Sequence, residues 1–289
     1  MTMDHSLRPA AVAGLFYPGS AAALKEAVEA CLAQARPGAS DRALPGAPKA
    51  VIVPHAGYVY SGPVAAHAYR RIAAGRATVR RIVVLGPVHR VPIHGLALPA
   101  ARAFATPLGT VRVDAEGAAR ALALPQVRVS EAAHALEHSL EVQLPFLQTV
   151  LEDFTIVPLA VGDATADEVA AVIDRLWGGA ETLIVVSSDL SHYHAYAEAR
   201  TLDGATARAI LALDASLDHE QACGATPING FARCARRRGL VPEVLDLRNS
   251  GDTAGDRARV VGYASFAFTE QALTPSAERA EALAEAADA

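Results

Sequence analysis

The sequence predicts an α/β fold, a three-layer sandwich in which helices cover both faces of a central mixed or mainly parallel sheet. Short aliphatic runs rich in β-branched residues recur along the chain and alternate with helix-length segments. Most of these runs lack polar alternation, which is typical of strands buried on both faces. With 289 residues and 52% hydrophobic content, the chain is also long enough to bury a core of single-domain size.

The elements follow in chain order. A helix is expected over residues 21–35, and a connector rich in Gly and Pro over residues 36–48. The expected strands are 50–53, 81–85, 156–161, 183–186 and 260–268. The helices expected between them are 62–74, 137–151, 166–177 and 199–213. One domain is expected over residues 1–270, and the Ala- and Glu-rich residues 271–289 are expected to form a frayed helix or to be disordered.

The charge and hydropathy patterns exclude some classes of protein. The 26 Lys and Arg residues are outnumbered by 31 Asp and Glu residues, and the net charge of −5 argues against a general nucleic-acid binder. The N-terminus has no apolar signal region, and no apolar stretch is long enough to cross a membrane. We therefore expect a cytoplasmic protein without a membrane partner.

The three cysteines differ in their surroundings. They form no CxxC pair and cannot build a disulfide framework. Cys31 and Cys234 lie in helical patterns, where cysteine usually serves as a small hydrophobe. Cys223 lies in the turn-rich segment ACGATPINGF, where a helix is not expected to bury the thiol, and it is the best candidate for a chemical role.

Three of the predicted strands are followed by a turn that contains histidine. These turns carry His55 in VIVPHAGYVYSG, His89 in VVLGPVHRVP, and Asp189, His192 and His194 in VVSSDLSHYH. Ligands of open α/β sheets bind beyond the carboxyl ends of strands, so side chains placed there can converge on one crevice. Two imidazoles and one anionic group form a metal-binding face that leaves positions open. The anionic partner could be Asp189, Glu141 or a cysteine thiolate.

The segment HALEHSLEVQLPF carries further polar side chains. His134 and His138 are four residues apart, with Glu137 and Glu141 beside them, so one helical face could present a His and a Glu. The segment lacks the His-Glu-x-x-His order of zinc proteases. Exposed pairing along a helix and a supporting role behind metal ligands both remain open.

Other enzyme motifs are absent from the sequence. It contains no G-x-S-x-G elbow, no Walker A loop and no G-x-G-x-x-G fingerprint. Ser187, Ser188, Asp189 and His192 have the residue types of a hydrolase triad, but such close neighbours in sequence rarely reach triad geometry. Serine hydrolase, nucleotidase and dinucleotide-binding functions are therefore not favoured.

Five segments follow one another along the chain: PHAGYVYSG, LGPVHRVP, EHSLEVQLPF, VVSSDLSH and CGATPING. Their order and spacing resemble those of the Memo family, whose bacterial and archaeal members are called AmmeMemoRadiSam system protein B. The resemblance extends from RPAAVAGLFYPGS near the N-terminus to VGYASFAF near the C-terminus. It implies a fold similar to that of class III extradiol ring-cleaving dioxygenases of the LigB type.

The resemblance also implies a metal pocket that matches His55, His89 and Cys223, with Asp189 and His192 lining it. In the dioxygenases the third iron ligand is a glutamate, and in the Memo pattern a cysteine takes its place. A thiolate tolerates Fe(II), copper or zinc. This chain has Arg90 where the animal branch has a second histidine, and it lacks the histidine that follows the cysteine in that branch. These departures argue against transferring the animal protein's signalling role.

The leading hypothesis is a redox enzyme in which these three ligands hold Fe(II) or copper and the partner is dioxygen or a small-molecule substrate. His192 would act as general acid or base, and Asp189 would orient it. Further candidates for the pocket are His138, Glu141, His194 and Tyr58. One alternative is a non-catalytic protein that binds a peptide or a partner enzyme; the family name points to AMMECR-type and radical-SAM proteins. A weaker alternative is a zinc hydrolase.

Overall fold

The computed structural model describes residues 6–35 and 47–270. Most of the connector expected over residues 36–48, and the whole tail expected over residues 271–289, lie outside the described residues. No described helix is both long enough and apolar enough to cross a membrane.

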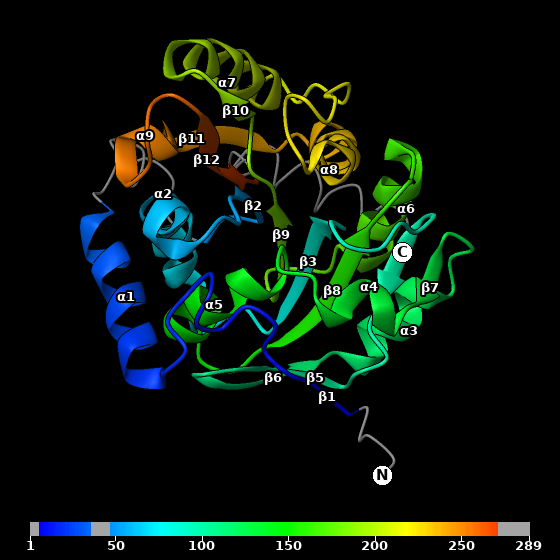
Figure 1. Ribbon diagram of the computed structural model, residues 1–289. Coiled ribbons are helices and arrows are strands. Elements are labelled where there is room, and N and C mark those ends of the chain that lie inside the picture. The colour runs from blue at the N-terminus through cyan, green and yellow to red at the C-terminus, as the bar shows by residue number, and fades with distance from the viewer. Residues whose placement is uncertain (1–5, 36–46, 271–289) are drawn as a thin grey trace, which may run out of the picture.

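Helices and strands alternate through most of the described chain (Figure 1). The helices are α1 (Ala21–Gln34), α2 (Tyr58–Ile72), η2 (Ala73–Gly75), α3 (Ala115–Leu122), α4 (Glu131–Ala135), η3 (Glu141–Gln143), α5 (Leu144–Val150), α6 (Ala166–Leu176), α7 (Tyr196–Leu211), α8 (Ala225–Arg237) and α9 (Ser250–Thr253), where η marks a 3-10 helix. The strands are β1 (Leu7–Arg8), β2 (Ala50–Val53), β3 (Arg81–Pro87), β4 (Leu96–Leu98), β5 (Ala103–Thr106), β6 (Gly109–Val113), β7 (Val127–Val129), β8 (Thr155–Val161), β9 (Thr182–Ser187), β10 (His192–His194), β11 (Val241–Asn249) and β12 (Val260–Thr269).

The strands of the described residues form one twelve-stranded sheet. Its main path is β1-β5-β6-β8-β3-β9-β2-β12-β10, with β11 paired to β12 and β4 paired to β7 and β8. At its centre β8, β3, β9 and β2 lie side by side and run parallel. The antiparallel pairs lie toward the edges, including β12 against β2 and β5 against β6. The predicted fold class, with a mainly parallel sheet between helices, is confirmed.

Two hydrophobic clusters lie on the two faces of the sheet. Along β2, Ala50 and Ile52 belong to one cluster, whereas Val51 and Val53 belong to the other, because successive side chains of a strand point to opposite faces. The first cluster includes residues of α6, α7 and α8, and the second includes residues of α1, α2 and α5. Figure 1 shows these two groups of helices on opposite sides of the central strands. Both faces of the central strands are buried, which explains their unbroken aliphatic sequences.

Several helix ends follow directly from local sequence. Ser20 caps α1 by accepting a hydrogen bond from Ala23 N, and Thr165 and Glu168 form a reciprocal capping box at the start of α6. The helix expected from residue 62 begins earlier, at Tyr58. Pro63 lies inside this helix, where proline removes one backbone hydrogen bond and crowds the preceding turn. Burial of the Tyr58 ring beside Tyr17 and Phe146 stabilises the first turn.

Two expectations about helices are wrong. A continuous helix over residues 137–151 does not form, since α4 ends at Ala135, a turn follows, and the helical part resumes as η3 and α5. Buried hydrogen bonds to the Glu137 carboxylate hold that turn. The segment after Cys223, expected to be turn-rich, instead begins α8. Pro227 fits there because the first turn of a helix has no intrahelical partner for its N–H groups.

Candidate metal centre

The ends of three central strands place the candidate site. The strands β2, β3 and β9 end at Val53, Pro87 and Ser187. His55, His89 and Asp189 each lie two residues beyond these ends. Because β9 is hydrogen-bonded to both β3 and β2, the three side chains lie at one edge of the sheet. This edge is the place where open α/β sheets bind ligands.

Three histidines form the group best able to hold a metal ion in the described residues. One ring nitrogen from each of His55, His89 and His138 lies within 4.8 Å of the others. The ring centroids are 5.2 Å apart for His55 and His89, 5.4 Å for His55 and His138, and 4.5 Å for His89 and His138. His138 comes from the turn before η3, so the group draws on a third loop that the pattern of strand ends did not include.

Cys223 lies beside this group, immediately before α8. Its Sγ atom is 3.2 Å from His55 Nε2 and 3.7 Å from the carbonyl oxygen of Asp189. Burial, reinforced by the negative charge of Asp189, raises the pKa of the Cys223 thiol to about 12. The thiol is therefore protonated at neutral pH, and a metal ion would have to displace its proton to gain a thiolate ligand.

The hydrogen bonds of His55 fix the orientation and the tautomer of its ring. Its Nδ1 atom lies 2.9 Å from Ser187 Oγ. Ser187 Oγ donates its only proton to the carbonyl oxygen of Ser139 and accepts a hydrogen bond from Gln143 Nε2. Ser187 can therefore only accept from His55, which assigns the ring proton to Nδ1 and leaves the lone pair of Nε2 facing Cys223. Burial and the neighbouring histidines hold the pKa of His55 well below its ordinary value, so the ring is neutral.

Glu137 links the two other histidines. Its carboxylate accepts hydrogen bonds from the backbone N–H and from Nδ1 of His89, at 2.6 and 2.9 Å, and from the backbone N–H of His138 at 2.9 Å. Burial alone would raise the pKa of Glu137, but the hydrogen bond and charge of His89, with the backbone donors, hold it at about 2. Glu137 was not among the predicted pocket residues, although a supporting role behind metal ligands was left open for its segment. The available signal was chemical: ligand histidines commonly donate their second ring nitrogen to a carboxylate.

His138 is the least satisfied of the three rings. Its Nδ1 atom is buried and has no hydrogen-bond partner among the described residues, although it lies 3.3 Å from Glu137 Oε1. Burial lowers the pKa of His138 to about 4, so this ring is also neutral. A buried polar atom without a partner costs free energy, and a metal ion is one way to satisfy it.

Asp189 and His192 lie at the same edge of the sheet, in different environments. Asp189 accepts a 2.7 Å hydrogen bond from the backbone N–H of His55, and burial raises its pKa to about 7 against the effect of that bond. His192 lies on β10 opposite Val261, and burial lowers its pKa. In the described part of the chain, no hydrogen bond joins Asp189 to His192. Asp189 positions the loop of His55 instead.

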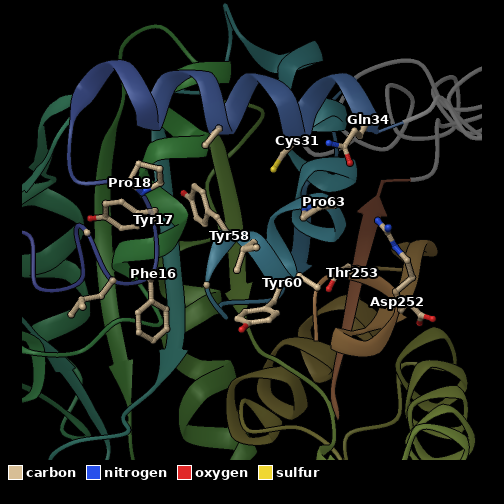
Figure 2. A pocket seen from close by; sticks show the side chains of 17 residues that line it. Phe16, Tyr17, Pro18, Cys31, Gln34, Tyr58, Tyr60, Pro63, Asp252 and Thr253 are labelled. Carbon is tan, nitrogen blue, oxygen red and sulfur yellow. The ribbon is translucent and has the colours of Figure 1, made fainter. Parts of the chain in front are cut away.

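The remaining sequence-predicted residues lie apart from the three rings. His194 pairs with Glu198 at 3.2 Å near the surface. Glu141 is fully buried and accepts hydrogen bonds from the N-terminal segment, among them one from Arg8. Tyr58 donates to the carbonyl oxygen of Val142 and lines a groove of about 750 Å³ below α1 (Figure 2), so it faces a different hollow from His89 and Cys223.

A pocket of about 490 Å³ opens at His89 and Cys223. Most of its wall is apolar: Pro87, Val88, Pro92, Ile93, Val161 and Pro227. Its polar lining includes Asp163, His219 and Thr226, of which the sequence analysis singled out none. His219 lies 3.2 Å from the carbonyl oxygen of Cys223 and 3.3 Å from the Thr226 hydroxyl. The pocket gives a small organic molecule access to His89 and Cys223.

Comparison with known proteins agrees with the segments noted in the sequence. The family model described as "Memo-like protein" matches residues 8–267. A MEMO1 family protein of Aeropyrum pernix is 37% identical over 284 residues, which cover 89% of this chain and 98% of the relative. A MEMO1 family protein of Methanopyrus kandleri is 36% identical, with 90% and 98% covered, and one of Nitrosopumilus maritimus is 34% identical, with 91% and 99% covered. The resemblance inferred from the five segments is confirmed: this chain belongs to the Memo family.

Proposed function

We propose that this protein is a metal-dependent redox enzyme that holds Fe(II) or copper with His55, His89 and Cys223. Dioxygen or a small organic molecule would be the reacting partner. The observation that carries the proposal is the convergence of three histidine rings within ligand reach of one another, with a thiol 3.2 Å from one of them. His138 is a further donor, and it would complete a set of three imidazoles and one sulfur.

The three histidines fit a metal ion in spacing, and two of them also fit in charge state. Neutral imidazole is the form that binds metals, and burial keeps His55 and His138 neutral. Two ligand atoms on one ion lie at most about 4.0–4.6 Å apart, since bonds of this type are about 2.0–2.3 Å long. The three ring nitrogens lie within 4.8 Å of one another, which is close to this limit. Imidazole and thiolate together suit iron, copper or zinc.

The bound metal would supply Lewis-acid and one-electron chemistry at the inner end of the pocket. The protein would supply the rest. The apolar wall formed by Val88, Ile93 and their neighbours would exclude water and orient the substrate. His192, half-buried near the histidine group, would donate or accept a proton as general acid or base. Asp189 would keep the His55 loop in place through the backbone hydrogen bond.

One observation also supports a second function, a zinc hydrolase. A set of three histidines with an open position is a known arrangement for zinc, which acidifies a bound water molecule toward neutral pH. The group of His55, His89 and His138 has that composition. In this case Cys223 would be a neighbour of the metal and not a ligand.

Elemental analysis of protein purified without oxygen or chelators tests the proposal. Wild-type protein and three variants would be compared: Cys223→Ser, His138→Gln and the control His194→Gln. We expect near-stoichiometric iron or copper in the wild type and the control, and at least ~10-fold less bound metal in Cys223→Ser. Iron or copper undiminished in Cys223→Ser contradicts the thiolate ligand, and zinc lost only in His138→Gln supports the hydrolase. Absence of metal from the wild type would favour a peptide- or partner-binding protein.

A further inference from the structure

The N-terminal segment, residues 7–18, lies against the loops that carry the candidate ligands. Its main anchor is Arg8. The Arg8 guanidinium donates to the carbonyl oxygens of His134 and Glu137, both at 2.7 Å, and to Glu141 Oε2 at 2.6 Å. A single side chain thus binds the turn that presents His138 at three points along its length.

Glu141, the carboxylate partner of Arg8, also binds the N-terminal segment at further points. Glu141 accepts backbone hydrogen bonds from Ala11 at 2.8 Å and Val12 at 3.0 Å, and it accepts the hydroxyl of Tyr17 at 2.5 Å. The side chains of Arg8 and Glu141 are only 4% and 0% exposed. A buried ion pair is a poor source of stability compared with apolar packing, because both charges lose their hydration. The directional hydrogen bonds of this ion pair instead hold the N-terminal segment and the segment of Glu141 in one relative position.

The same segment also contacts the candidate centre more directly. The Phe16 ring packs on the ring of His138, with centroids 4.6 Å apart. The Phe16 carbonyl oxygen accepts a hydrogen bond of 2.7 Å from the backbone N–H of Tyr58, which follows the His55 loop at the start of α2. Tyr17 packs beside Tyr58 at 5.6 Å (Figure 2). The N-terminal segment therefore bridges the His55 loop and the turn of Glu137 and His138.

We propose that the N-terminal segment is a positioning element of the metal centre, and that Arg8 and Phe16 are its positioning residues. Arg8 would act through Glu137, since it fixes the turn whose carboxylate holds His89 and the backbone of His138. Phe16 would limit the rotation of the His138 ring. This inference rests on the proposed metal centre, but it concerns the residues that hold the ligands and not the reaction.

Cobalt(II) is the probe for the test, because its visible spectrum reports ligand geometry. The test variant combines Arg8→Met with Glu141→Gln, so that no unpaired charge stays buried while Gln still accepts hydrogen bonds from the segment. The matched control is Lys49→Met. Lys49 is also a buried cation that donates to backbone carbonyls, at Trp177, Gly179 and Thr182, but it lies before β2, at the opposite end of that strand from His55.

We expect the double variant to bind cobalt at least about tenfold more weakly, with an altered visible spectrum, in line with losses at residues that support metal ligands. The single variant Arg8→Lys should bind cobalt more tightly than the double variant. Lys49→Met should bind cobalt as tightly as the wild type, even if the variant is less stable. An unchanged affinity and spectrum in the double variant would overturn the inference. Should the double variant not fold, Phe16→Ala takes its place, with the same expected direction and the same overturning result.

A second readout separates this inference from the proposed function. In metal-free protein with isotopically labelled histidine, the Nδ1 proton of His89 that is bonded to Glu137 gives its own resonance, and we expect the double variant to shift or broaden it. If wild-type protein does not bind cobalt but this resonance changes in the double variant, the proposed metal centre is wrong and the positioning role stands. If the resonance does not change in the double variant and that variant binds cobalt normally, the positioning role is wrong and the metal centre stands.

Discussion

The carboxylate of Glu137 organises two candidate ligands at once. It accepts hydrogen bonds from Nδ1 and the backbone N–H of His89, in the loop after β3, and from the backbone N–H of His138, in its own turn. A charge buried among these donors remains ionised, and its pKa of about 2 reflects their combined effect against burial. The His89 ring proton is thereby assigned to Nδ1, and Nε2 is left available for a metal ion.

Replacement of this carboxylate should therefore weaken metal binding without removing a ligand. For Glu137→Gln we expect an affinity loss of about 10–100-fold, because a neutral amide orients and polarises the His89 ring less well. Competition titration of cobalt or zinc against a chromogenic chelator measures it. The matched control is Glu198→Gln, which alters the exposed pair with His194 and should leave the affinity nearly unchanged. Equal affinities for the two variants would argue that Glu137 has no part in metal binding.

Single residues differed in how far the sequence could predict their positions. His55, His89 and Asp189 follow strands that neighbour one another, so the strand pattern alone predicted that they would meet at one edge. His138 joins them through a turn whose shape depends on Arg8, a residue 129 positions before Glu137. No local pattern near His138 contains that information. The assignment of His55, His89 and Cys223 as ligands stays a prediction until a metal is measured.

At the level of elements, the junction between β9 and α8 decides where Cys223 lies. Gly224 comes directly after the cysteine and caps α8, and its backbone N–H donates to Ser188 Oγ. A Cβ atom at this position would lie 2.6 Å from Ser188 Cβ and 2.9 Å from the carbonyl oxygen of Ser187. The absence of a side chain therefore lets the start of α8 approach the end of β9 closely, which brings the thiol to His55.

Enlarging this residue should displace the helix. For Gly224→Ala we expect a loss of about 1–3 kcal/mol in the free energy of unfolding, since the close contacts with Ser187 and Ser188 leave no room for a methyl group. Denaturant titration followed by circular dichroism gives this value. Gly204→Ala on α7 is the control, because its nearest contact would be 3.7 Å away and alanine favours a helix interior. A Gly224→Ala protein as stable as the control would show that the junction is loosely packed.

Elements defined by hydrophobic pattern were the ones that the sequence predicted well. All five expected strands correspond to observed strands, because each is a largely apolar run whose side chains are mostly buried. The short strands β1, β4 to β7 and β10, and the edge strand β11, were not predicted. Their sequences are short or partly polar, and they become strands by pairing with neighbours. The helix expected over residues 137–151 failed for a related reason: contacts between distant residues outweighed local propensity.

The stability of the whole molecule should respond to acid through His134. This side chain is buried and lies 2.9 Å from the carbonyl oxygen of Ala97, to which its Nε2 donates. Burial lowers its pKa from 6.5 to about 4. The unfolded chain takes up a proton below about pH 6.5, whereas the folded protein does so only near pH 4, so stability falls as the pH drops between these values. Above pH 6.5 the residue contributes no pH dependence.

The comparison of wild-type protein with His134→Gln isolates this effect, because glutamine can still donate to Ala97 and does not titrate. We expect the wild type to lose on the order of 3 kcal/mol relative to the variant between pH 6.5 and about 4, which corresponds to the pKa difference. Free energies of unfolding from urea titrations at several pH values would provide the two curves. Parallel curves would mean that His134 is protonated equally in the folded and unfolded states.

The pairing of Arg8 with Glu141 also has a consequence for biosynthesis. The two residues are 133 positions apart, so the N-terminal segment is translated well before its docking partner. The sheet centre is completed later still, when β9 and β12 are translated and pair with β2. Contacts of such long range form late because loop closure must precede them. The N-terminal segment can thus reach its native place only after the turn around Glu141 has been made.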